Sequence, residues 1–379
     1  MGIVLFIIIF CVVVLGHEFG HFIVAKANGI HVVEFSIGMG PTLLHFDKGD
    51  TRYCVKLLPI GGACMFEGED GLNNAEEDEA DSDGQKEAAE HKNPEEKAAN
   101  RKELGTLKKS GAFPDASVFA RIATVVAGPV FNFILAFIFS AIIVGSIGTD
   151  LPVIASVEES GAAEMAGLKA GDEIVKINGR NIHLFREISL EAMLNEGEAV
   201  ELLYVRDGER FATTLTPQYS QKADRYFYGI TGQAGYTKFG PAGILKYSAY
   251  EVRYWVNTTI RSLGMLLRGK AGVKDLSGPV GMADVVDDIY TQSKQDGAFY
   301  VWINMLNFAI LLSANLGVLN LIPFPALDGG RIFLLLIEAI RKKPISPEKE
   351  GIFHFVGFAL LMILMVVVMY NDIVKLITG

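Results

Sequence analysis

Residues 3–25 read IVLFIIIFCVVVLGHEFGHFIVA, an apolar run that leads directly into the motif HEFGH at residues 17–21. A helix that crosses the hydrocarbon core of a bilayer needs about 20 predominantly apolar residues. The run therefore predicts a first transmembrane helix over residues 1–27. Ionisable side chains are costly inside a membrane and usually have a function there, so the motif is the first candidate site.

The composition and three further apolar stretches extend this pattern over the chain. Of 379 residues, 50% are hydrophobic and 21% are charged, and the mean hydropathy is +0.31. A soluble domain is about one quarter charged, so a polytopic α-helical membrane protein is expected rather than a wholly soluble, disordered or collagen-like chain. The other three of four predicted transmembrane helices lie within residues 118–148, 299–332 and 352–379.

The charges and cysteines exclude several other classes of protein. Most of the net charge of −10 falls in residues 67–117, a segment poor in apolar residues. Such a composition is typical of disorder, so we predict a disordered cytoplasmic insert there. No basic patch with interleaved aromatic residues occurs, and no nucleic-acid partner is expected. Three cysteines without a Cys-x-x-Cys pair argue against a disulfide scaffold or a thiolate zinc site.

Lysine and arginine residues concentrate in two connecting loops. One follows the first predicted helix and the other covers residues 333–351. Because short cytoplasmic loops of membrane proteins carry an excess of these residues, both loops are expected in the cytoplasm. Both chain termini and residues 149–298 are then expected outside it, with the lipid bilayer as a partner of the chain.

Residues 28–66 predict a membrane-associated β-hairpin. The segments LLHF and YCVKLL flank the turn residues Lys48, Gly49 and Asp50, an arrangement typical of a hairpin. A β-structure beside an intramembrane site would have to be buried in protein or line a cavity. The sequence leaves open whether the hairpin does this or rests on the membrane surface.

Residues 149–220 have the character of a soluble α+β domain, with strand-like runs separated by Asn-Gly and Asp-Gly turns. The segments AGL (166–168), GDEI (171–174) and ING (177–179) resemble the signature of bacterial PDZ domains. The resemblance implies one extracytoplasmic PDZ domain, which either binds an extended peptide by strand addition or excludes bulky substrates. Residues 221–298 look amphipathic and are expected at the membrane interface or packed on this domain.

The spacing within HEFGH indicates a metal site. His17 and His21 lie four residues apart, so on a helix they share one face. Two imidazoles in this spacing can bind one Zn²⁺, and Glu18 between them can act as general base on the water of the metal. A helix end at the membrane surface would also tolerate these residues, but it would explain their spacing only by chance.

A catalytic zinc site needs a third protein ligand and an open position for water. The best candidate is Asp328 in NLIPFPALDGG, residues 320–330, at the end of the third predicted span. Pro323 and Pro325 break the helix there, and irregular backbone at membrane depth is tolerated beside a cavity or inside protein. The alternative role for Asp328 is a helix N-cap, which would explain one Asp before two glycines but not the rest of the segment.

Taken together, HEFGH and NLIPFPALDGG resemble the site-2 proteases, the zinc-dependent intramembrane metalloproteases, and fit their bacterial RseP/RasP branch. The resemblance runs from residue 3 to about residue 370. It implies a multi-pass zinc metalloendopeptidase of the bacterial cytoplasmic membrane. Its substrates would be single-span membrane proteins, such as anti-sigma factors or remnant signal peptides.

The resemblance also implies roles for individual residues. His17, His21 and Asp328 would ligate Zn²⁺, and Glu18 would activate the water and pass its proton to the leaving amine. Some relatives carry two PDZ domains, and the acidic insert has no counterpart; neither departure touches the chemistry. The residues implied to bind substrate are Asn320, Pro323, Pro325 and Asn132, of which Asn132 could equally form an interhelical hydrogen bond.

Two other functions compete with an intramembrane protease. A catalytically inactive membrane scaffold that recruits proteins through its PDZ domain would lack a ligand or the base, and the sequence has all of them. A channel or transporter would show internal repeats, and the two halves of the sequence show none.

Overall fold

The structure is a computed structural model that describes residues 1–68, 111–221, 225–233, 235–270, 272 and 276–378. Most of the insert predicted over residues 67–117 lies outside these residues. The chain divides into two compact units. The first unit comprises residues 1–134, 272–295 and 316–379, and the second comprises residues 135–271 and 296–315.

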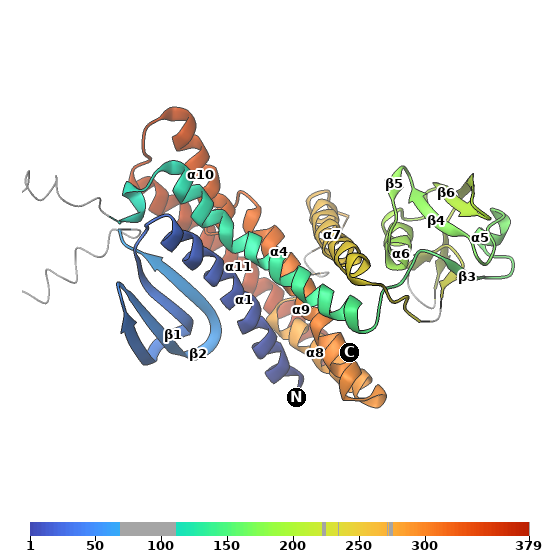
Figure 1. Cartoon of the computed structure of the whole chain (residues 1–379), viewed down its shortest axis with the longest axis horizontal. Helices are drawn as coiled ribbons and strands as arrows, with labels where there is room; N and C mark the ends of the chain where they lie inside the picture. The colour runs from blue at the N-terminus through green and yellow to red at the C-terminus, as the bar shows by residue number, and fades with distance from the viewer. Residues whose placement is uncertain (69–110, 222–224, 234, 271, 273–275, 379) are drawn as a thin grey trace, which may run out of the picture. The chain divides into compact units, whose positions relative to one another are not determined.

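Four helices are long and apolar enough to cross a membrane, judged by length and composition within the described residues. They are α1 (Gly2–Ala27), α4 (Val118–Ser146), α9 (Ala298–Leu321) and α11 (Pro347–Thr378) (Figure 1). Much of their apolar surface is exposed, as at Phe355 and Ile363 of α11. Exposed apolar surface of this extent marks contact with a membrane or a partner, which fits the predicted membrane protein.

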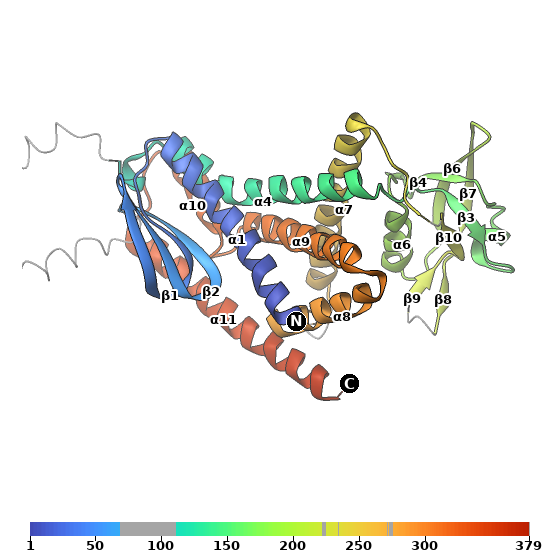
Figure 2. The same cartoon turned by 60° about the horizontal axis from the view of Figure 1, so that its bottom comes forward.

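A β-sheet packs against α1 in the first unit. It is formed by β1 (Val32–Lys48) and β2 (Thr51–Phe66), which run antiparallel from the turn at Gly49, where φ is 62°. Residues 34–37 also pair with residues 62–65. Figure 2 shows both strands beside α1, and a small core joins the sheet to the end of that helix: Ala25, Ile30, Val32 and Phe66. The predicted hairpin is therefore present and rests on the helix that carries HEFGH.

Two shorter helices complete the first unit, together with the 3₁₀ turn η2 (Phe113–Asp115). The N-terminus of α8 (Pro279–Asp296) is held by Asp372 of α11, whose carboxylate accepts hydrogen bonds from the backbone of Gly278 at 3.2 Å and Gly281 at 2.8 Å. The helix α10 (Asp328–Arg341) is tied to the start of α4 by an ion pair between Glu338 and Arg121. These contacts join α8 to α11 and α10 to α4.

The second unit contains the α+β domain. Its main sheet has the order β5-β4-β6-β7, and α6 packs on a core that includes Ile174, Ile188 and Leu202. The structure extends this domain beyond residue 220, because β10 pairs with β3. The elements are β3 (Ile154–Val157), α5 (Ala162–Met165), β4 (Glu173–Ile177), β5 (Arg180–Asn181), α6 (Phe185–Leu194), β6 (Val200–Arg206), β7 (Glu209–Leu215), β8 (Gln218–Ser220), β9 (Arg225–Phe227) and β10 (Ile230–Gly232).

The amphipathic helix α7 (Pro241–Leu267) packs on this domain through ion pairs. Arg186 of α6 contacts Glu251 at 3.1 Å, and two further pairs join the helices: Arg253 with Glu187, and Arg261 with Glu191. Burial raises the pKa of Glu251 to about 7, although Arg186 acts in the opposite direction. For the part of residues 221–298 that forms α7, the structure shows packing on the α+β domain, one of the two placements that the sequence left open.

Candidate metal centre

The two histidines of HEFGH face the same point from one side of α1. Their Nε2 atoms are 3.1 Å apart, and both residues are buried, at 6% and 7% exposure. The helical period places side chains four residues apart on one face, as the sequence predicts. Two potential metal-ligating nitrogens thus lie side by side on one face of an apolar helix.

Asp328, the first residue of α10, brings a third potential ligand atom to the histidines. Its Oδ2 lies 3.0 Å from His17 Nε2 and 3.4 Å from His21 Nε2. In a tetrahedral zinc site with bonds of 2.0–2.2 Å, neighbouring ligand atoms are about 3.3–3.6 Å apart. The distances between these three atoms are therefore close to those that one Zn²⁺ requires.

The hydrogen bonds behind the histidines support the same conclusion. His21 Nδ1 lies 2.9 Å from the backbone oxygen of Thr124, and a carbonyl oxygen only accepts, so Nδ1 carries the proton. His21 Nε2 then presents its lone pair to the site. Oδ2 of Asp328 is buried and makes no hydrogen bond of good geometry within the described residues. Lone pairs that converge in a buried site need a cation between them.

The backbone before Asp328 explains why its carboxylate reaches the histidines. Helix α9 ends at Leu321, and Pro323 and Pro325 follow in an irregular segment. A Cβ on Gly329 would lie 2.0 Å from the backbone oxygen of Ile322, so only glycine allows the chain to fold back this tightly. The N-cap of α10 is Leu327 and has no side-chain cap hydrogen bond. The N-cap role considered for Asp328 is therefore not the one seen.

The helix α4 covers the histidines with a glycine that the sequence analysis missed. A Cβ on Gly128 would lie 2.3 Å from His21 Nε2 and 2.7 Å from His17 Cε1. Gly20 of α1 is equally close to α4, since its Cβ would lie 2.5 Å from the backbone oxygen of Ala127. The Gly-Pro pair in the apolar sequence around Gly128 is the local signal that could have indicated a close contact.

Glu18 points from the same helix toward the sheet. Its carboxyl group accepts a hydrogen bond from the backbone of Cys64 in β2. A Cβ on Gly62 would lie 3.2 Å from Glu18 Cγ, so a glycine lets the glutamate approach the strand. The sheet thus contacts the side chain of the candidate base directly.

The structure brings both candidate asparagines to His17. Asn132 Nδ2 lies 3.1 Å from His17 Nδ1, and Asn320 Nδ2 lies 3.3 Å from His17 Nε2. Pro323 and Pro325 lie in the segment between Asn320 and α10. All eight candidate residues therefore belong to one unit, and five of them meet in direct contact: His17, His21, Asn132, Asn320 and Asp328.

An HExxH helix, a distant aspartate and a buried site among apolar helices define a zinc metallopeptidase that works within a membrane. The comparison with known families agrees: the model of peptidase family M50 matches residues 5–364. The chain belongs to this family.

Curated relatives match over nearly the full length. The chain is 33% identical to zinc metalloprotease RasP of Geobacillus kaustophilus, over 99% of this chain and 98% of that protein. It is 32% identical to the regulator of sigma-W protease RasP of Bacillus subtilis, with 99% and 98% covered. Among solved structures, the PDZ domain of an SdrC-like protein from Listeria monocytogenes is 23% identical with a TM-score of 0.20, and the match covers 22% of this chain and 87% of that one.

Proposed function

We propose that His17, His21 and Asp328 hold the zinc of this intramembrane protease, with Glu18 as its base. The observation that carries this assignment is the convergence of three ligand atoms within 4.8 Å of one another. Zinc bound there supplies a Lewis acid, which lowers the pKa of water toward 7 and polarises the scissile carbonyl group.

The protein side chains then carry the protons of the hydrolysis. Glu18 accepts a proton from the attacking water while the water oxygen bonds to the carbonyl carbon. It gives that proton to the amide nitrogen as the C–N bond breaks. The hydrogen bond from Cys64 orients the carboxyl group for both steps, and the surrounding apolar helices keep bulk water from the site.

Asn132 and Asn320 have different roles in this mechanism. If His17 binds zinc through Nε2, its Nδ1 carries a proton, and the Asn132 side chain can turn its carbonyl oxygen toward that proton. Asn132 then orients a ligand rather than the substrate, a different role from the one implied by the resemblance. Asn320, together with Pro323 and Pro325, lies at the irregular backbone and holds an unwound substrate segment.

The charge distribution supports an orientation in a bacterial cytoplasmic membrane with four transmembrane helices. The loops that follow α1 and α10 carry the excess of Lys and Arg and lie in the cytoplasm. The PDZ-like α+β domain lies outside. Single-span membrane proteins would reach the site from the lipid, and anti-sigma factors and remnant signal peptides are the proposed substrates.

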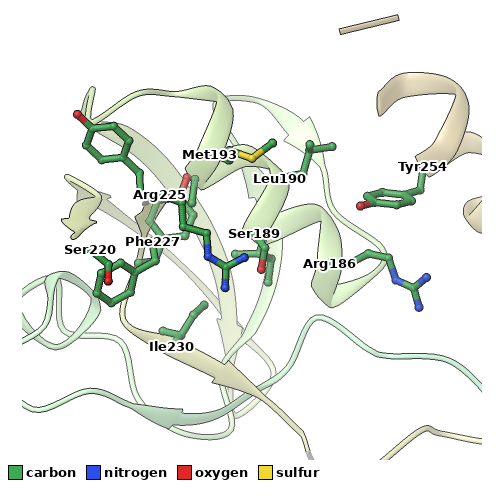
Figure 3. A pocket seen from close by; sticks show the side chains of 13 residues that line it. Arg186, Ser189, Leu190, Met193, Ser220, Arg225, Phe227, Ile230 and Tyr254 are labelled. Carbon is green, nitrogen blue, oxygen red and sulfur yellow. The ribbon is translucent and has the colours of Figure 1, made fainter. Parts of the chain in front are cut away.

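The PDZ-like domain offers a groove for part of such a substrate. A pocket of about 420 Å³ opens between α6 and β9. Figure 3 shows Leu190 and Met193 of α6 and Arg225 and Phe227 of β9 around it. An extended peptide can bind there by strand addition. Met193→Glu should then raise KM for substrates that keep an outer segment, while Met165→Glu, at an exposed position of α5, should not; an unchanged KM would favour a domain that only excludes bulky proteins.

The central test is the cleavage of a reconstituted single-span substrate by the wild type and by Glu18→Gln. Both proteins should contain one zinc per chain, and the wild type alone should cleave within the span of the substrate. Equal cleavage by both would overturn the role of Glu18. Wild-type protein without zinc, and without activity after zinc is added, would favour the inactive scaffold.

A further inference from the structure

A strained turn stands directly before the third ligand. Ala326 has φ of 73°, in the left-handed region that residues with a Cβ avoid. It lies two residues before Asp328, so a change of its backbone angles would swing the carboxylate away from the histidines. A conformation of this kind persists only where the surroundings hold it.

The side chain that holds this turn comes from α11. The backbone N–H of Ala326 donates a hydrogen bond of 3.1 Å to Nδ1 of His354. The helix comes close enough for this because of Gly357, where a Cβ would lie 2.2 Å from Cβ of Pro325. The contact therefore links the last helix of the chain to the segment that carries the third ligand.

The direction of this bond fixes the state of the imidazole. A backbone N–H can only donate, so Nδ1 of His354 is unprotonated and its proton sits on Nε2. Nε2 is buried and has no hydrogen-bond partner among the described residues, and the nearest carboxylate oxygen recorded, Glu350 Oε1, is 3.9 Å away. The hydrogen bond from Ala326 is thus accepted by a neutral imidazole.

We propose that His354 is a positioning residue for the metal site. Its Nδ1 holds the left-handed turn at Ala326 and so keeps Asp328 aimed at His17 and His21. The inference rests on the proposed zinc ligands and adds a residue 26 positions further along the chain that touches neither metal nor substrate.

Two substitutions of His354 test whether the hydrogen-bond acceptor must stand at the position of Nδ1 or whether any polar group at this residue is enough. The amide of His354→Asn stands where Nδ1 stands, three bonds from Cα, whereas that of His354→Gln stands one bond further out. In the full-length protein, the zinc dissociation constant is measured by competition with a chromogenic chelator. Supporting residues of this kind change metal affinity by about 10- to 100-fold. We expect H354Q to weaken zinc binding about tenfold and H354N to retain most of the affinity, with Phe355→Gln, at the exposed neighbouring position, as the matched control.

A second variant tests the turn itself. Glycine adopts the left-handed conformation without a steric cost, so Ala326→Gly should restore most of the zinc affinity of H354Q. Ala326→Val should weaken zinc binding even with His354 present, and it serves as the test if H354Q cannot be purified. At saturating zinc, KM should be unchanged in H354Q and H354N, because the side chain of His354 is not placed on the substrate.

The outcomes separate this inference from the proposed function. Equal zinc affinity in wild type and H354Q, equal losses in H354N and H354Q, or no rescue by Ala326→Gly would each overturn the role of His354. Wild-type protein that does not bind one zinc per chain would instead overturn the proposed metal site.

Discussion

Gly128→Ala is the substitution that tests the metal centre most directly. The added Cβ would stand 2.3 Å from His21 Nε2, 2.5 Å from His21 Cε1 and 2.7 Å from His17 Cε1. Non-bonded heavy atoms favour about 3.5–4.0 Å, so three contacts are too short by roughly 1 Å. The imidazoles can relieve them only by rotating, and rotation removes both nitrogens from the metal position.

Substituting a residue that only supports a metal ligand weakens metal binding by up to about 100-fold, and we expect Gly128→Ala to weaken zinc binding more than that. Zinc binding should therefore weaken by at least about 100-fold, equivalent to roughly 2.8 kcal/mol. The assay is chelator competition on metal-stripped, repurified protein, followed by cleavage of a single-span substrate at limiting zinc. Folding should persist, because the crowded atoms are side-chain tips that can turn away.

Gly145→Ala in the same helix is the matched control. Its Cβ would meet Ile244 at 3.6 Å, an ordinary contact, so zinc affinity and cleavage should stay near those of the wild type. If Gly128→Ala bound zinc within a few-fold of the wild type, the imidazoles would not point where the structure places them. The assignment of His17 and His21 as ligands would then fail.

Three further predictions concern the third ligand, the contact between α4 and α10, and the second unit. Asp328→Asn removes a charged ligand, so zinc affinity should fall by at least about tenfold in chelator competition, and unchanged affinity would remove Asp328 from the ligand set. Arg121→Gln leaves the partly buried carboxylate of Glu338 without its ion-pair partner, which should cost about 1–3 kcal/mol and lower the temperature of thermal inactivation; Arg121→Glu with Glu338→Arg should recover part of the loss. The native pKa of Glu251, about 7, lies above the value of about 4.3 in an unfolded chain, so the native state binds more protons between these values. The contribution of Glu251 to stability should therefore fall as pH rises through 7. Glu251→Gln should flatten the pH dependence of the unfolding temperature. If the unfolding temperature of the wild type depended on pH no more steeply than that of the variant, the raised pKa of Glu251 would be contradicted.

The residues of the proposed ligand set could be singled out from the sequence because each member stands out against its local sequence. HEFGH interrupts an apolar helix, and Asp328 is an acidic residue in a proline- and glycine-rich break at the end of another. In an apolar setting every ionisable group is costly, so few alternatives compete. The four apolar helices follow from the same contrast, since length and hydropathy are local properties of the chain.

The contacts that align the ligands could not be predicted in the same way. Thr124 acts through its backbone oxygen, Gly128 through the absence of a side chain, and His354 through a backbone N–H 28 residues away. Of these roles, only that of Gly128 leaves a local signal in the residue types, the Gly-Pro pair within an apolar run. The predicted end of the α+β domain at residue 220 is too early for a related reason. The strands β9 and β10 that lie beyond it are three residues long, too short to show the period of a strand.

The helix that carries two of the proposed ligands is in close contact with α4 on one face and with β2 on another. Gly20 and Gly128 bring α1 and α4 so close that a methyl group fits at neither position, and Gly62 lets β2 contact Glu18 on another face. At Gly20 the neighbouring atom is the backbone oxygen of Ala127, which cannot turn away as a side-chain tip can, so α1 is not free to rotate toward a substrate. A substrate helix must therefore bring its own unwound segment to the metal. In the function proposed above, the irregular backbone between Asn320 and Asp328 would offer peptide groups to such a segment, because this part of the chain lacks the hydrogen bonds of a regular helix.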